Sequence, residues 1–252
     1  MVLNMEEKLE TINPTIRQAD DNIYLNENRY EKPKEIFKEL VKIFRQKFDG
    51  YEKKVFLDAG CATGEFIWYG KSEFPQGTFT GLDVSPEMIK FAKNQLANCR
   101  FEVGSVLDSN IFNPETFDAI TCSGVLSIFD DQKAPIQNLI SWLKPGGHLL
   151  IYTIVNQDPV DMIMRYRDVT KSPEPWESGW NIFSKKTFDA ILKSVEPKVT
   201  WDWNEFKMPF SLERQKDPMR TWTIKTEDNP FQLINGAGQL INGQILHVQK
   251  PA

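Results

Sequence analysis

Hydrophobic and polar positions alternate along the middle of the chain between two periods. Short apolar runs typical of strands, from KKVFLDAG at residue 53 to GHLLIYTIV at residue 147, are separated by stretches with apolar residues at helical spacing. Between them lie TFTGLDV, RFEVGSV and FDAITCSG. Because strands that alternate with helices form parallel sheets, the pattern predicts an α/β fold with a doubly wound, mostly parallel sheet.

The apolar positions also predict where the helices lie. A first amphipathic helix is expected over residues 33–48, a second from Gly64 and a third from Pro86, which suits the first turn of a helix. A fourth is expected around 133–143. It should be followed at 144–147 by a Lys-Pro-Gly-Gly turn into the next strand.

Two stretches fall outside this alternation. The connection 156–183 is rich in Met, Arg, Tyr, Pro and Trp and is long for a compact domain, which predicts a lid or substrate pocket after the fifth strand. The polar residues 1–32 are a second lid or a tail. A helix and alternating runs predict antiparallel strands, including an antiparallel C-terminal strand, over 184–252. With a cofactor-binding core at 33–155, these parts form one predicted domain, 1–252.

Composition narrows the class of protein. The chain has 40% hydrophobic and 26% charged residues with a net charge of −5, which is typical of a globular domain and argues against a nucleic-acid partner. An acidic start and the lack of about 18 uninterrupted apolar residues predict a soluble, cytoplasmic protein without a membrane partner. The widely spaced Cys61, Cys99 and Cys122 predict reduced thiols and no metal.

The ends of the first two strands carry the candidate chemistry. Asp58 leads into a turn of small residues at 60–64, and Asp83 ends the next strand, where an acid can accept the hydroxyl protons of a ribose. A dinucleotide site requires a third glycine, which is missing here, and Glu65 would lie beside the pyrophosphate. An acidic turn suits a cofactor that carries an ammonium and a sulfonium but no phosphate.

On these motifs the sequence resembles the class I S-adenosylmethionine-dependent methyltransferases over roughly residues 30–155. The glycine turn and Asp83 are followed by the turn Gly104-Ser105-Val106 and by FDAI leading to Ser123-Gly124-Val125-Leu126. The run LKPGG at 143–147 is also similar to that family's turn before its fifth strand. The resemblance implies a Rossmann-like sheet and S-adenosyl-L-methionine as the cofactor.

The resemblance also implies which residues bind this cofactor. The glycine turn and the loop 123–125 would contact the methionine part, Asp83 the ribose, Val84 one face of the adenine and residues 105–106 its edge. Ala62 replaces the common middle glycine of the turn. The cofactor-binding residues predicted in this way are Asp58, Gly60, Cys61, Ala62, Gly64, Asp83, Val84, Met88, Ser105, Val106, Ser123, Gly124 and Val125.

Acceptor recognition is predicted from the stretches outside the core. The run Arg165-Tyr166-Arg167 is either a solvated helix face or a clamp for a carboxylate or phosphate. The tryptophans, including Trp201 and Trp203, either pack between elements or wall a pocket. No general base stands out, because His148 and His247 lie within strands and Asp130, Asp131, Asp168 and Glu177 are equivalent candidates. The predicted acceptor-binding residues are Tyr24, Tyr30, Arg165, Tyr166, Trp176 and Trp180.

Three functions fit these features. The first is methyl transfer from S-adenosylmethionine to a small-molecule acceptor, at an oxygen, nitrogen or carbon atom, by a monomer or homodimer. The second is a nicotinamide-dependent oxidoreductase on a similar sheet. The third is a catalytically inactive S-adenosylmethionine-binding protein that serves as a partner.

Overall fold

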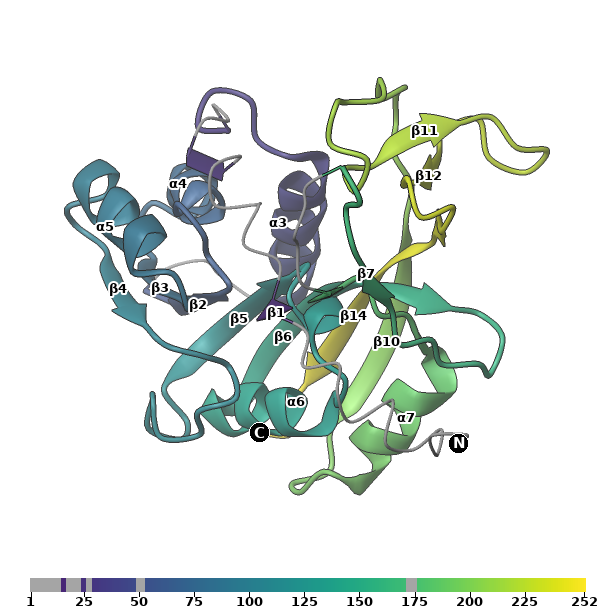
Figure 1. Cartoon of the computed structure of the whole chain (residues 1–252). Coiled ribbons are helices and arrows are strands. Elements are labelled where there is room, and N and C mark those ends of the chain that lie inside the picture. Colours follow the sequence, from purple (N-terminus) through teal and green to yellow (C-terminus); the bar gives the residue numbers. More distant parts are fainter. Residues whose placement is uncertain (1–14, 17–23, 26–28, 49–52, 171–175) are drawn as a thin grey trace, which may run out of the picture.

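The computed structural model describes residues 15–16, 24–25, 29–48, 53–170 and 176–252 (Figure 1). Its helices follow the alternation predicted from the sequence. They are α3 (Glu35–Lys47), α4 (Glu65–Glu73), α5 (Pro86–Gln95), the 3-10 helix η1 (Leu126–Ile128), α6 (Lys133–Trp142) and α7 (Lys185–Ser194). The strands are β1 (Thr15–Ile16), β2 (Val55–Ala59), β3 (Thr78–Asp83), β4 (Arg100–Val103), β5 (Phe117–Ser123), β6 (Leu143–Asn156), β7 (Arg165–Tyr166), β8 (Glu177–Ser178), β9 (Phe183–Ser184), β10 (Thr200–Phe206), β11 (Trp222–Ile224), β12 (Gln232–Ile234), β13 (Leu240–Ile241) and β14 (Gly243–Gln249).

The main sheet has the strand order β10-β14-β6-β5-β2-β3-β4. The five strands β6, β5, β2, β3 and β4 run parallel to one another, whereas β14 pairs antiparallel with β6 and β10 antiparallel with β14. The predicted α/β class and the Rossmann-like, mostly parallel sheet are therefore confirmed. Antiparallel strands were predicted for 184–252, and two of the strands found there, β10 and β14, belong to this sheet.

Helices cover both faces of the sheet, as a doubly wound fold requires. The apolar side chains of α3, α4 and α5 pack with one set of inward-facing sheet residues, such as Phe56 and Leu150. Those of α6 and α7 pack with the alternate set, which includes Leu57 and Leu149. Figure 1 shows α3 on one side of the sheet and α6 and α7 on the other. Neighbouring residues of one strand point to opposite faces, so each strand contributes to both clusters.

The structure of the Lys-Pro-Gly-Gly run differs from the predicted one. Residues 144–147 lie inside β6, which begins at Leu143, and do not form a separate turn before the strand. Gly146 has a φ of +74°, and the register between β5 and β6 shifts between Phe117 and Ala119. The paired register with β5 passes from Leu143 directly to His148, so residues 144–147 form an irregular start of the strand, which a sequence pattern of proline and glycine does not distinguish from a turn.

The described residues of the connection 156–183 form short strands and no helix. Arg165 and Tyr166 form β7, so the prediction that this run is a helix face is wrong. Strand β8 pairs antiparallel with β7 and parallel with β1 from the N-terminal segment, which makes a three-stranded sheet outside the main one. The two stretches that the sequence set apart from the core therefore meet each other.

The C-terminal part contributes β10 and β14 to the main sheet and a small antiparallel sheet, β11-β12-β13. Trp201 and Trp203 of β10 both donate their indole N–H to Asp189 Oδ1 of α7, at 2.7 and 3.2 Å. These two tryptophans thus hold α7 to the sheet and act as packing residues. Among the described residues, no helix is long and apolar enough to span a bilayer, and no group of three or more His, Cys, Asp or Glu residues could hold a metal ion.

Candidate functional site

The candidate site lies where the sheet order reverses. Strand β2 has β5 on one side and β3 on the other, so the chain leaves it at a topological switch point, where open α/β sheets bind their ligands. The turn after β2 has left-handed backbone at Gly60, Ala62 and Gly64, with φ of +84°, +45° and +87°. Ala62 adopts a conformation that favours glycine, which agrees with its place at the family's middle glycine.

Gly60 lets the loop after β5 approach the turn. A Cβ atom at Gly60 would lie 2.1 Å from Val125 Cγ2, which is far inside van der Waals contact. Gly124, also in that loop, has a φ of +74° but nothing within 4 Å of its Cβ position. The turn after β2 and the loop after β5, both predicted to contact the methionine part of the cofactor, therefore pack directly against each other.

Asp83 at the end of β3 holds the glycine turn in place. Its Oδ2 accepts from the backbone N–H of Ala62 at 2.8 Å, and its Oδ1 accepts from that of Ser85 at 3.0 Å. Each carboxylate oxygen keeps a second lone pair that can accept a ribose hydroxyl. Burial raises the pKa of Asp83, and backbone hydrogen bonds from Ser85, Ala62 and Val84 oppose that rise. Asp83 therefore supports the turn as well as being the candidate ribose ligand.

Asp58 is a buried carboxyl group at the end of β2. Its side chain receives a hydrogen bond of 2.8 Å from the Thr121 hydroxyl. Burial raises the pKa of Asp58 to about 7, the charge of Asp83 raises it further, and the Thr121 bond and the positive charge of Lys34 lower it. A cationic group bound beside Asp58 would stabilise its ionised form.

The N-terminal segment lies against the glycine turn. The Tyr30 hydroxyl donates to the carbonyl oxygen of Thr63, and the Tyr30 ring packs edge-on against Trp68 of α4 at 5.5 Å. Lys34 Nζ lies 3.9 Å from Oε2 of the buried Glu65. Within the described part of the chain, Thr63 Oγ1 is buried and has no hydrogen-bond partner. The segment thus covers a turn that presents a polar atom with unused bonding capacity.

The other residues predicted at the cofactor divide into exposed and buried ones. Val84 is 60% exposed, as a residue that stacks on an adenine must be before the cofactor binds. Cys61, Met88 and Val106 are buried, so their side chains pack in the core and only backbone atoms can face a ligand. The Ser105 hydroxyl accepts from the backbone N–H of Leu107 at 3.1 Å, which shapes the turn after β4.

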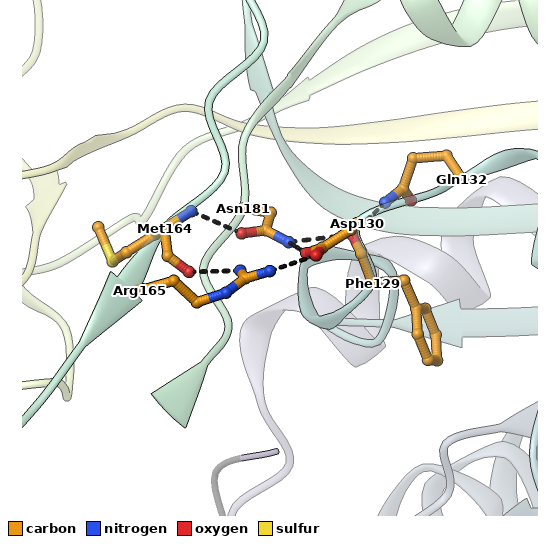
Figure 2. Close-up of polar contacts among 6 residues, drawn as sticks. All are labelled: Phe129, Asp130, Gln132, Met164, Arg165 and Asn181. Atoms are coloured by element: carbon orange, nitrogen blue, oxygen red, sulfur yellow. Dashed lines mark hydrogen bonds and ion pairs between the residues drawn. The ribbon is translucent and has the colours of Figure 1, made fainter. Parts of the chain in front are cut away.

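Asn181 joins the insertion to the loop after β5, and sequence reasoning missed it. Its backbone N–H donates to Ser127 O at 2.8 Å, and its side-chain Oδ1 accepts from the backbone N–H of Met164 at 2.8 Å. Its Nδ2 donates to Phe129 O and to Asp130 Oδ1 (Figure 2). Asn181 is 1% exposed, and a buried amide with all these partners fixes the insertion relative to the loop.

Arg165 belongs to the same cluster. Its guanidinium pairs with Asp130 Oδ2 and donates to the carbonyl oxygen of Met164 at 2.8 Å (Figure 2). Gln132 donates to Leu126 O and Phe129 O from the other side and braces the same loop. The arginine predicted as a clamp for an acceptor anion is thus engaged with a carboxylate of the protein, next to the candidate site.

The remaining predicted acceptor residues do not gather at one point. The Tyr24 ring lies under the ammonium of Lys34. Trp180 has a φ of +59° and packs against a separate apolar cluster formed by Ile154, Ile182, Leu233 and Ile241. Trp176 is 40% exposed and stacks with Arg167. No pattern in the sequence separates these roles, because all are aromatic residues in segments without periodicity.

A second polar cluster lies away from the switch point. His148 Nδ1 and His247 Nε2 are 2.9 Å apart, and His247 Nδ1 is 2.6 Å from Asp202 Oδ1. Burial lowers the pKa of His148 to about 4, and the charges of His247 and Lys47 lower it further. His148 pairs with Ala119 near the amino end of β5. Both histidines are buried within strands and lie against each other, which agrees with the prediction that neither stands out as a general base.

The family is shown by comparison with known proteins. A family model described as a methyltransferase domain matches residues 51–214. The chain therefore belongs to this family of methyltransferase domains, and the class predicted from the sequence, the class I S-adenosylmethionine-dependent methyltransferases, is confirmed. S-adenosylmethionine is the cofactor of this class, which argues against the nicotinamide alternative. The polar atoms of the turn, an acidic edge and an exposed Val84 fit such a cofactor.

The chain is similar to curated enzymes of bacteria over part of their length. A malonyl-[acyl-carrier protein] O-methyltransferase of Halalkalibacterium halodurans is 32% identical over 107 residues, 40% of either chain. A trans-aconitate 2-methyltransferase of Deinococcus radiodurans is 34% identical over 103 residues, 40% of this chain and 38% of that protein. The matches thus cover less than two thirds of these relatives.

A solved structure shares the fold at low sequence identity. The [4+2]-cyclase SpnF superposes with a TM-score of 0.58 at 16% identity, and the match covers 85% of this chain and 81% of that one. That protein is named for a cyclisation. The fold alone therefore does not fix the reaction.

Proposed function

We propose that this protein transfers the methyl group of S-adenosylmethionine to a small-molecule acceptor. The cofactor lies along the carboxyl ends of β2, β3 and β5, with Asp83 at its ribose and the glycine turn at its methionine part. The acceptor enters beneath the N-terminal segment and the insertion 156–183. The bound cofactor supplies an electrophilic methyl group on a sulfonium.

One observation supports the proposed position of the acceptor. The N-terminal segment contacts the turn after β2 through Tyr30, and its strand β1 pairs with β8 of the insertion. The insertion is in turn bonded through Asn181 to the loop after β5. Two segments far apart in the sequence thus form one cover over the switch point, and a cover there suits a reaction that must exclude water.

The chain's contribution to the reaction is alignment. Displacement at a sulfonium methyl requires the acceptor atom in line and near contact distance, and packed loops on both sides can fix that geometry. The loop 123–131 faces the turn after β2 and is braced by Gln132 and Asn181, so it is the element best placed to orient the acceptor. Asp130 is engaged with Arg165, and we assign no general base.

The relatives support an acceptor group that is a small organic acid. Both act, by their names, on organic acids, one free and one carried on a protein. The net charge of −5 gives no support for a nucleic-acid acceptor. We also propose a single domain that works in a reducing compartment as a monomer or homodimer. Its three cysteines are free, two of them buried, which agrees with that compartment.

The experiment that tests this function uses S-adenosylmethionine with an isotopically labelled methyl group. The purified protein is incubated with it and a fractionated extract of small metabolites, and mass spectrometry searches for labelled products. A labelled small molecule that forms only with active protein supports the proposal. Tight binding of S-adenosylmethionine without any labelled product, over extracts of several organisms, favours the inactive binding partner instead.

A variant of the insertion tests whether the cover and the cofactor site have separate roles. Replacing residues 160–180 with a short Gly/Ser linker removes β7 and β8 but leaves Asn181. We expect S-adenosylmethionine binding to stay within roughly tenfold, about 1.4 kcal/mol, while methyl transfer to the identified acceptor is abolished. Undiminished transfer would place the acceptor elsewhere.

A further inference from the structure

Lys34 holds a positive charge at the acidic edge of the sheet. It precedes Glu35 at the N-terminus of α3, and its Nζ lies 3.9 Å from Oε2 of Glu65, the first residue of α4. The same ammonium lies 4.6 Å from the centre of the Tyr24 ring and 5.6 Å from that of Phe37. Two aromatic faces and a buried carboxylate thus fix its position.

The surroundings of Lys34 are strongly acidic. The turn after β2 is bordered by Asp58, Asp83 and Glu65, of which Asp58 and Glu65 are buried. The positive charge of Lys34 lowers the pKa of Asp58, against the effect of burial, so its field reaches this carboxyl group. The cofactor proposed for this edge brings an ammonium and a sulfonium, both of which Lys34 repels.

We propose that Lys34 is a specificity-determining residue whose ammonium offsets the acidic edge and so reduces the preference of the site for the sulfonium cofactor over its neutral thioether product. This inference rests on the proposed position of the cofactor. The positive charge leaves the sulfur during methyl transfer, so a site that bound the sulfonium too strongly would stabilise the ground state and raise the barrier. Lys34 limits that stabilisation, while the donors and acceptors around the ribose serve both ligands equally.

The test is calorimetric titration with three probes that share one nucleoside. S-adenosylmethionine carries a sulfonium, sinefungin an ammonium at the corresponding position, and S-adenosylhomocysteine a neutral sulfur. We expect Lys34→Met to raise the ratio of the affinity for S-adenosylmethionine to that for S-adenosylhomocysteine by about threefold to tenfold. The affinity for sinefungin, which is also cationic, should rise in the same way. Lys34→Arg keeps the charge and should leave the ratio unchanged.

The matched control removes one positive charge from the next turn of the same helix. Lys38 is exposed and pairs with Glu35 at 2.5 Å, so Lys38→Met should change the ratio by less than about twofold. Glu65→Gln tests the same coupling from the other side and does not depend on the folding of the Lys34 variant. It should lower the ratio, because it removes a negative charge next to Lys34.

Two results would overturn the inference. In one, Lys34→Met weakens all three ligands equally, as expected of a residue that binds the cofactor's carboxylate. In the other, a folded Lys34→Met protein has an unchanged ratio or, where that variant does not fold, Glu65→Gln leaves the ratio unchanged. Asp83→Asn, titrated in parallel, separates this failure from that of the proposed site. If Asp83→Asn weakens the binding of both cofactor and product, while the Lys34 and Glu65 variants leave the affinity ratio unchanged, only the role of Lys34 is wrong. If Asp83→Asn has no effect, the cofactor position itself is wrong.

Discussion

The acidic edge and the histidine cluster are both polar groups within the same sheet, but they are built differently. At the acidic edge the backbone adopts left-handed conformations at three positions of one turn, and Thr63 Oγ1 has no bonding partner among the described residues. In the histidine cluster, His148, His247 and Asp202 are bonded to one another within regular strands. Strain and an unused polar atom therefore distinguish the edge at which we propose that the cofactor binds.

Charge separates the two regions as well. Burial lowers the pKa of both histidines, and Asp202 opposes this effect at His247. At the acidic edge burial raises the pKa of Asp58 and Asp83, which leaves carboxyl groups whose ionised form a cation would stabilise. The histidine cluster is complete without a ligand, whereas at the acidic edge Asp58, Asp83 and Glu65 outnumber the nearby ammonium of Lys34.

The largest effect should come from filling the contact between the turn and the loop. Gly60→Ala places a Cβ 2.1 Å from Val125 Cγ2 at a φ of +84°, so we expect a loss of about 2–5 kcal/mol in unfolding free energy. Gly124→Ala, with a similar φ and open space, should cost only about 1–2 kcal/mol. Urea unfolding measures both. Equal losses, or no recovery when Val125→Ala is added to Gly60→Ala, would contradict the proposed contact.

The histidine cluster should make the protein sensitive to acid. Unfolded His148 binds a proton below about pH 6.5, but the folded side chain does so only near pH 4. The unfolded state then binds more protons, so stability should fall by about 2–3 kcal/mol as the pH falls from about 6.5 to about 4. Thermal unfolding across this range measures it. His148→Gln should flatten the slope, and an unchanged slope in that variant would assign acid sensitivity to other groups.

At the acidic edge, Asp58 should make the affinity for the cofactor depend on pH. With a pKa of about 7 in the free protein, Asp58 is partly protonated at neutral pH and must lose its proton beside a cationic ligand. Affinity for S-adenosylmethionine should therefore rise by up to about tenfold between pH 6 and pH 8. Calorimetry in buffers of different ionisation enthalpy should detect the released proton. Asp58→Asn should remove both effects, and a proton release that persists in it would exclude Asp58 as the source.

The smallest expected effect concerns the tryptophans of β10. Asp189→Asn weakens the acceptor for both indole N–H groups, which should cost about 1 kcal/mol of stability. Affinity for S-adenosylmethionine should not change, because this contact holds α7 to the sheet. A loss of cofactor affinity with unchanged stability would instead place Trp201 and Trp203 at the site.

The sheet could be predicted because strands and the helices between them are encoded by local, periodic patterns of apolar residues. The strand ends at Asp58 and Asp83 are marked by an apolar run that stops at an acid, and the glycine turn by its small residues. Asn181 and Lys34 could not be found in this way. Asn181 matters because its side chain bonds to residues 51 and 52 positions away, and Lys34 because it lies beside the buried Glu65; neither long-range contact nor burial is periodic in sequence.

The insertion shows the same limit from another side. The length of 156–183 predicted a cover, but its residues Arg165 and Tyr166 were expected on a helix and lie in β7. Their conformation depends on pairing with β8, which is itself paired with the N-terminal β1. Pairing between segments more than 150 positions apart in sequence leaves no signal in either one.

The central claim is that the carboxyl edge of the sheet holds the cofactor, and one matched pair of variants tests it. Asp83→Asn changes an acid at that edge and keeps one acceptor for the turn. Asp118→Asn changes an acid near the start of β5, where it accepts from the backbone N–H of Val55 and pairs with Lys144. Calorimetry with S-adenosylhomocysteine should show a loss of affinity of about tenfold or more for Asp83→Asn, the scale of charge-assisted hydrogen bonds, and less than about twofold for Asp118→Asn. Equal affinities for Asp83→Asn and the unmodified protein, or a larger loss for Asp118→Asn, would contradict it.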